Sequence, residues 1–327
     1  MAKVTRDEAL DGLKFILIAF VIIGHAIEPS RYINNVSGII YSVIYSFHMP
    51  LFVMLSGYFS KSLNLQKINS QTWLLLETYF IMAVVIGFMM GYGYRIMVRP
   101  SISCWYLLSL IFWRYLLYLC IVKLKMNKRR FLFFSFMIAL LSFCLPVARY
   151  YEVLSLMRTS QFFLFFVVGY CLNGEIIQIL RDKKGARMVL RFSALVILMI
   201  VALTSSRSLH VLEFHRDSFV GLIRDTDWNV YTCFFYKVLL VGANLVLCSA
   251  LLTIRKFPRS FSYYGSGTLL FFFIQGVVVH KVTAMLPAKL YFELILSLVV
   301  IMLGGAFLPF KNWITNPVTS FVKLKKY

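Results

Sequence analysis

Two ionisable residues near the start of the chain, Lys14 and His25, stand eleven positions apart in an otherwise apolar stretch. At about 100° per residue, that separation in an α-helix lies about 20° from a whole number of turns, so both side chains share one helix face. Asp11 lies three positions before Lys14 and falls on the same stripe. Because an imidazole accepts and releases protons near neutral pH, His25 is a candidate general base. Asp11 and Lys14 are candidates for binding a charged substrate.

A structural role accounts for the same three residues. Asp11 and Lys14 would then anchor the helix at a membrane interface, and His25 would form a hydrogen bond with a neighbouring helix. The spacing alone leaves both interpretations open.

A second histidine, His48, lies two positions before Pro50. Since proline has no N–H, the carbonyl of Ser46 loses its helical partner, and we expect a kink beside His48. Ser56 and Gly57 are small enough for another helix to approach closely. Kinking and packing account for these neighbours but not for His48, which is therefore the second catalytic candidate.

Transmembrane helices must position these side chains. The 327 residues are 60% hydrophobic and 14% charged, and the mean hydropathy is +0.79, values that exclude a water-soluble globular fold. The apolar blocks do not alternate as barrel strands do, and each is long enough for a helix to cross the bilayer. The sequence predicts an all-α polytopic bundle of about ten helices. The expected spans are 13–30, 36–59, 73–92, 103–122, 131–147, 161–179, 189–205, 230–253, 266–285 and 290–308.

The net charge of +21 describes topology rather than nucleic-acid binding. A cytoplasmic N-terminus puts most of the 34 Lys and Arg residues on the cytoplasmic side, so we expect a multi-pass protein of the inner (plasma) membrane with both termini cytoplasmic. Residues 1–327 form one domain, and the polar stretch 206–229 is an extracytoplasmic loop that could serve as a lid or a ligand-binding surface. The six cysteines have no metal-ligand or disulfide spacing, so no metal site is predicted.

Other polar residues in the spans are weaker candidates for substrate binding. Ionisable groups in a membrane are costly, so Glu77 and Arg114 either bind a substrate or form interhelical pairs. Trp105 either binds a substrate or belongs to an interfacial aromatic belt. No Walker loop, HExxH or G-x-S-x-G motif occurs, so these residues belong to no common soluble hydrolase pattern.

Several segments together resemble the membrane-bound acyltransferase family 3, the multi-spanning O-acyltransferases of cell-surface glycans. The matching segments are Leu10–Lys14 with Gly24-His25, Phe47–Phe52, Leu55–Tyr58, Cys104–Leu110, and Tyr264–Leu269 running into Phe273–Gln275. The family signature has arginine, ten intervening residues and then histidine; this chain has Lys14 at the arginine position, which keeps the charge but not the bidentate fork. Many members carry histidine where this chain has Gln275.

The resemblance implies transfer of an acyl group, usually acetyl from acetyl-coenzyme A, to a sugar hydroxyl of a surface polysaccharide or its lipid-linked precursor. Acetyl-coenzyme A would be a co-substrate rather than a resident cofactor, and the other partners would be the glycan acceptor and membrane lipid. His25 would be the base or pass the acyl group outward, while Lys14 and Asp11 would steer the phosphate-bearing donor at the inner mouth. Glu77, Trp105, Arg114 and Gln275 remain binding candidates. The competing function is a transporter or flippase of a glycolipid intermediate, although we find no inverted repeat.

Overall fold

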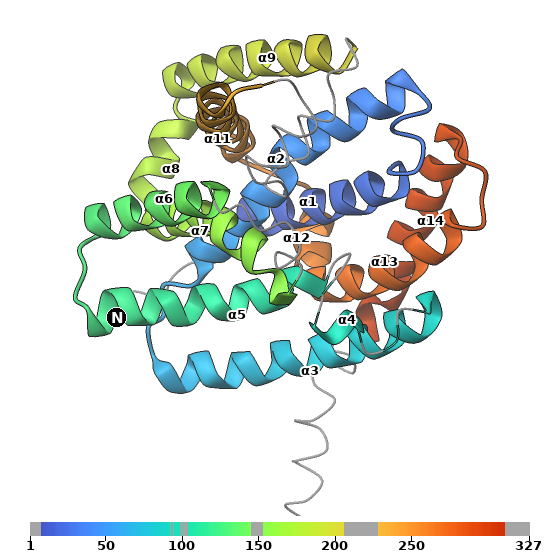
Figure 1. The fold of residues 1–327 in the computed structure, drawn as a ribbon, viewed down its shortest axis with the longest axis horizontal. Coiled ribbons are helices and arrows are strands. Elements are labelled where there is room, and N and C mark those ends of the chain that lie inside the picture. The colour runs from blue at the N-terminus through green and yellow to red at the C-terminus, as the bar shows by residue number, and fades with distance from the viewer. Residues whose placement is uncertain are drawn as a thin grey trace, which may run out of the picture.

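The computed structural model describes residues 8–91, 93, 95–98, 100, 104–144, 153–205 and 228–310. These residues form a helical bundle without strands (Figure 1). The elements are α1 (Glu8–Ala26), α2 (Asn35–Phe59), α3 (Leu65–Met90), α4 (Arg95–Val98), α5 (Cys104–Tyr118) with the π-helical turn η1 (Leu119–Lys123), α6 (Lys128–Cys144), η3 (Val153–Ser155), α7 (Leu156–Cys171), α8 (Gly174–Arg181), α9 (Lys183–Ser205), α11 (Val230–Leu252), α12 (Arg259–Gly265), α13 (Thr268–Thr283), α14 (Leu290–Phe307) and η5 (Leu308–Phe310).

The expectation of a polytopic all-α membrane bundle is confirmed. Within the described residues, 8 helices are long and apolar enough to cross a membrane, or up to 9 if the bent pair α12 and α13 is one span. α6 covers the remaining expected span but has only 17 residues. About ten crossings were expected, and α6 is the helix on which that count depends.

Asparagine caps set several helix boundaries that the hydropathy pattern placed wrongly. The side chain of Asn64 accepts the N–H groups of Gln66 and Lys67, so α3 begins at Leu65 rather than near residue 73. Asn173 caps α8 in the same way, so the expected span 161–179 is two helices with a break after Cys171. α1 ends at Ala26 rather than near residue 30, which puts His25 in its last turn.

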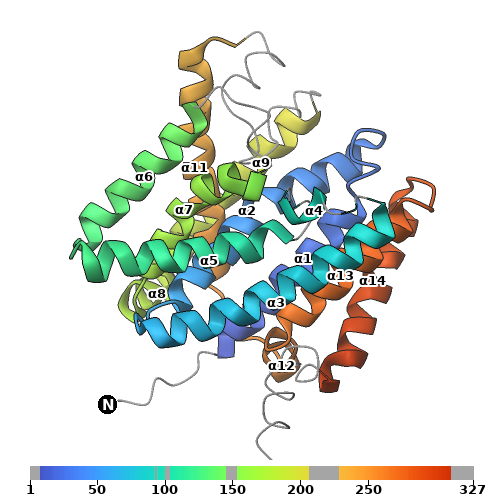
Figure 2. The same cartoon turned by 60° about the horizontal axis from the view of Figure 1, so that its bottom comes forward.

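The first two helices form the centre of the bundle, between α3 and α5 on one side and α9 and α11 on the other (Figures 1 and 2). Of the apolar window in each of α1 and α2, 61% is buried, against 11% for α9. The large exposed apolar side chains of α9, such as Leu195 and Leu198, are those expected on a face that meets lipid. Among the ionisable residues of α1, Asp11 is therefore buried, and Lys14 and His25 are partly buried by protein.

Close backbone contacts hold α2 in place. A Cβ atom on Gly57 would lie 1.9 Å from the carbonyl oxygen of Phe166, and one on Gly169 would lie 1.8 Å from that of Met54. Only glycine fits at both positions, so α2 and α7 pack backbone to backbone. The expected close approach of another helix at Gly57 is confirmed.

Candidate active site

Both ends of α1 turn a polar side chain toward α2. Near the start of α1, Nζ of Lys14 lies 3.8 Å from the centre of the Phe59 ring. In its last turn, Nδ1 of His25 lies 3.3 Å from the hydroxyl of Tyr45. Eleven residues of helix separate the two by about 16 Å along the axis. The seam between α1 and α2 thus carries an ammonium group at one end and an imidazole at the other.

The two ring nitrogens of His25 have different surroundings. Nδ1 faces the Tyr45 hydroxyl and lies 3.6 Å from a carboxylate oxygen of Glu28, just beyond the end of α1. Nε2 forms no hydrogen bond with another described residue, and the side chain keeps 17% of its exposure. When Nδ1 carries the proton, Nε2 is the free acceptor that a general base needs.

Small and aromatic residues place Tyr45 beside His25. A Cβ atom on Gly24 would lie 2.9 Å from Cε2 of Tyr45, so the absence of a side chain there lets the ring pack against α1. On its other side Tyr45 stacks on Tyr41, with ring centres 3.8 Å apart. This packing accounts for the glycine in the Gly24-His25 pair.

Glu28 lies among cationic groups. A guanidinium nitrogen of Arg31 lies 3.4 Å from its carboxylate, and the same guanidinium donates to the Tyr41 hydroxyl. Burial raises the pKa of Glu28, but the hydrogen bond and charge of His25, with the charges of Arg31 and His280, outweigh it and lower that pKa to about 2. Glu28 therefore remains a carboxylate beside His25 at any physiological pH.

Two further histidines lie in this region. The ring of His280, from α13, lies 5.0 Å from that of His25, and its Nε2 is buried without a hydrogen bond to another described residue. His48 is 2% exposed, and its Nδ1 lies 2.8 Å from the carbonyl oxygen of Ile44, to which it donates. The ring of His48 meets that of Tyr45 edge-on at 4.6 Å. Both sequence-predicted histidines thus contact Tyr45.

Sequence reasoning missed Glu28, Tyr45 and His280. Glu28 follows His25 by three positions, the spacing that paired Asp11 with Lys14, so the same rule could have found it. No local signal connects His280 to His25, because only the packing of α13 on α1 brings them together.

At the other end of α1, the charge of Lys14 already has a partner. Its Nζ donates to Asp11 at 2.9 Å, and Asp11 is 4% exposed. A Cβ atom on Gly265 would lie 1.9 Å from the backbone oxygen of Asp11, so the bend of 68° between α12 and α13 follows directly after a close contact with α1. The segment Tyr264–Leu269 therefore packs against the Asp11 end of α1.

The remaining candidates lie on α3, α5 and α13. Trp105 is buried against Phe162, with ring centres 5.3 Å apart, and the guanidinium of Arg158 lies 5.4 Å from its ring, so it is not part of an exposed aromatic belt. Gln275 is fully buried on α13. Glu77, on α3, forms no ion pair with another described residue.

Arg114 lines a small pocket together with Phe59, the residue that Lys14 contacts. Of the predicted loop 206–229, residues 206–227 lie outside the described residues. The described part of the chain contains no group of three or more His, Cys, Asp or Glu residues placed to hold a metal ion.

Comparison with known proteins gives one match. A family model described as an acyltransferase domain, that of the acyltransferase 3 family, matches residues 7–311, nearly the whole chain. The match includes the first two helices and the helices that carry Gln275 and His280. No curated protein and no solved structure matches the chain.

Proposed function

Because the chain belongs to the acyltransferase 3 family, we propose that it transfers an acetyl group from acetyl-coenzyme A to a sugar hydroxyl. The acceptor is a cell-surface polysaccharide or its lipid-linked precursor. The observation that carries the proposal is His25, enclosed in the bundle with Nδ1 flanked by Tyr45 and Glu28 and with Nε2 free of described partners. The enzyme lies in the inner (plasma) membrane with both termini cytoplasmic, the orientation that the basic residues favour.

His25 is the general base of this reaction. Its Nε2 accepts the proton of the acceptor hydroxyl while the hydroxyl oxygen attacks the carbonyl carbon of the thioester. The new C–O bond forms, the C–S bond breaks, and the imidazolium returns its proton to the thiolate, so that coenzyme A leaves as the free thiol. Glu28 stabilises the imidazolium that exists between the two proton transfers.

Tyr45 and His48 support His25 from α2. The hydroxyl of Tyr45 lies 3.3 Å from Nδ1 of His25, and the His48 imidazole lies against the Tyr45 ring. Since His48 is buried and donates to the carbonyl of Ile44, we assign it to positioning Tyr45 rather than to proton transfer.

The donor binds at the Lys14 end of α1. The ammonium of Lys14 attracts its phosphates, and the buried Asp11 carboxylate holds that ammonium at the α1 and α2 seam. The pantetheine arm is an extended chain, and it runs along this seam to bring the thioester to His25.

Transfer of radiolabelled acetyl from acetyl-coenzyme A to extracted surface glycan tests the proposal. Membranes that contain the wild-type protein should label the glycan, whereas membranes with an equal amount of His25→Ala should not. A protein that moves a glycolipid across vesicles but never labels it would be a flippase, and this outcome would overturn the proposal.

A further inference from the structure

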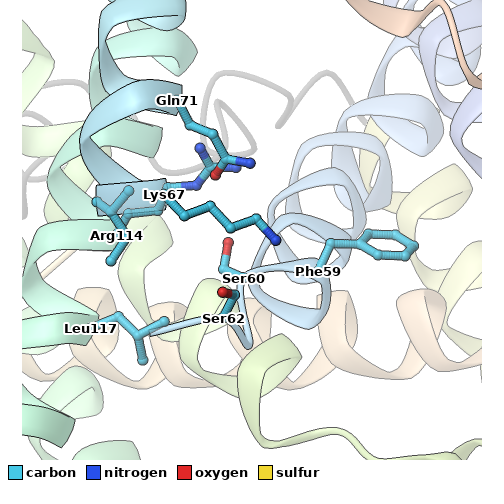
Figure 3. Close-up of a pocket in the computed structure, with 8 residues that line it drawn as sticks. Phe59, Ser60, Ser62, Lys67, Gln71, Arg114 and Leu117 are labelled. Atoms are coloured by element: carbon cyan, nitrogen blue, oxygen red, sulfur yellow. The ribbon is translucent and has the colours of Figure 1, made fainter. Parts of the chain in front are cut away.

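A small pocket lies at the Lys14 end of the bundle, between the turn after α2, the first turns of α3 and the second half of α5. Its volume is about 30 Å³, enough for more than one water-sized group. The polar residues that line it are Ser60, Ser62, Lys67, Gln71 and Arg114. Figure 3 shows the ends of Lys67, Gln71 and Arg114 and the Ser60 hydroxyl gathered around the same space.

The lining has two cationic side chains and no carboxylate. The side chains of Lys67 and Arg114 form no hydrogen bond or ion pair with another described residue. Arg114 belongs to a predicted membrane span, where an unpaired guanidinium is costly. An anion in the pocket would remove that cost, and phosphate groups accept hydrogen bonds from a planar fork, a mobile ammonium and a hydroxyl such as that of Ser62. The Ser60 hydroxyl already donates to the backbone oxygen of Ser56.

Asp11, an acidic residue of the seam between α1 and α2, already has a cationic partner. Asp11 is paired with Lys14, whose ammonium lies over the ring of Phe59, a residue of the pocket wall. Phe59 thus separates the pocket from the α1 and α2 seam that leads to His25. A ligand with phosphate groups in the pocket and an extended arm along the seam would pass Phe59.

We infer that this pocket binds a phosphate group of the nucleotide portion of the acyl donor, through Arg114 and Lys67 with Ser62 and Gln71. The inference rests on the proposed function for the identity of the donor. Lys14, at the entry to the seam, then attracts the donor's other phosphates, and the pocket supplies affinity rather than chemistry. A phospholipid headgroup offers the same phosphate chemistry and is the alternative occupant.

The test compares ligands with and without the nucleotide, using full-length protein in phosphatidylcholine discs. Calorimetry measures the affinity for coenzyme A, and turnover is measured with acetyl-coenzyme A and with acetyl-pantetheine, which has no phosphate. Arg114→Gln should weaken coenzyme A binding about ten- to hundredfold. It should leave turnover of acetyl-pantetheine unchanged, while Arg114→Lys should restore part of the affinity.

Lys67→Gln repeats the test at an exposed position, where the fold is not at risk, and should weaken coenzyme A binding several-fold. Lys61→Gln is the matched control, because the Lys61 ammonium donates to the backbone oxygen of Leu172 outside the pocket. It should leave the affinity unchanged. The assignment would be overturned if wild type and Arg114→Gln bound coenzyme A equally well. It would also be overturned if Arg114→Gln lost turnover of acetyl-pantetheine as strongly as turnover of acetyl-coenzyme A.

A second set of discs containing phosphatidylglycerol distinguishes the lipid headgroup. Competition by this lipid that disappears in Arg114→Gln, with no effect of the substitution in phosphatidylcholine alone, would assign the pocket to lipid. If the wild-type protein binds coenzyme A through Arg114 but transfers no acetyl group, the assignment of the pocket would stand and the proposed transferase function would be wrong.

Discussion

The two ends of α1 use ionisable residues in different ways. At the start of the helix, Lys14 has a fixed partner in the buried carboxylate of Asp11 and lies over an aromatic ring. At its end, His25 has partners among the described residues on one nitrogen only. A charge that is already paired can attract and orient a ligand, whereas a free nitrogen can also exchange a proton. We therefore propose that one end of α1 binds the donor and the other carries out the chemistry.

The largest effect is expected at the chemical end. His25→Ala should lower kcat by about 10²–10⁴, because it removes the group that accepts the proton of the acceptor hydroxyl. The measurement is acetyl transfer per mole of folded protein. Because His25 keeps part of its exposure, its loss should leave the thermal midpoint within a few degrees of wild type. Near-normal transfer by the variant would remove His25 from the chemistry.

Paired glycine substitutions separate packing at the two ends. At the Lys14 end, Gly265→Ala would push a Cβ atom against the rigid backbone oxygen of Asp11 and should lower stability by about 1–3 kcal/mol. At the His25 end, Gly24→Ala meets the ring edge of Tyr45, which can rotate away. It should cost less stability but reduce kcat, and denaturation with parallel kinetics measures both. A greater loss of stability in Gly24→Ala than in Gly265→Ala would contradict the comparison.

A smaller effect on catalysis is expected from Glu28→Gln. Since the carboxylate stabilises the imidazolium, its loss should lower kcat about tenfold with little change in the KM for the donor. A purely structural role would lower stability while leaving the kcat of the folded protein near the wild-type value.

The pH dependence of wild-type stability should also depend on the Glu28 carboxylate. The pKa of Glu28 is lowered from 4.5 to about 2 in the folded protein, so the folded state keeps this group charged where the unfolded chain binds a proton. Its contribution to stability is complete above pH 4.5 and is lost as the pH falls toward 2. In Glu28→Gln, this part of the acid dependence should be missing from thermal denaturation curves.

The sequence predicted the helical bundle well because long apolar blocks have few alternatives in lipid. It could not place the boundaries that single asparagine caps determine, such as the start of α3 after Asn64. Helical periodicity put Lys14 and His25 on one face, and both contact α2 in the structure. Periodicity has no information about which helix lies opposite, so the contacts of His25 with Tyr45 and His280 required the fold.

The different surroundings of Arg114 and Glu77 also could not be predicted without knowing how the helices pack. Both are ionisable residues within predicted spans, and their sequence contexts do not separate them. Arg114 lines a pocket with a second cation, whereas Glu77 has no ion pair with another described residue. Only the packing of α3 against α5 and the turn after α2 assigns a site to one and not to the other.

The smallest effect is expected from substitutions of Lys14. They are the most direct test of the proposed difference between the two ends of α1. If Lys14 attracts the donor as a point charge, Lys14→Ala should raise the KM for acetyl-coenzyme A several-fold with kcat little changed, because an interaction present in both the bound and the transition state affects binding alone. Lys14→Arg should preserve activity, since the resembling family has arginine at this position and the charge is retained.

Asp11 supplies the control for this prediction. Asp11 is buried beside Lys14, so Lys14→Ala takes a cationic partner from a buried carboxylate, and a loss of stability could imitate a loss of binding. The double variant Asp11→Asn with Lys14→Ala removes the carboxylate together with the ammonium. If the KM stays high while the thermal midpoint recovers, Lys14 binds the donor. If the KM returns to the wild-type value with the midpoint, the pair only anchors α1, and the assignment of binding to this end would depend on Arg114 and Lys67 alone.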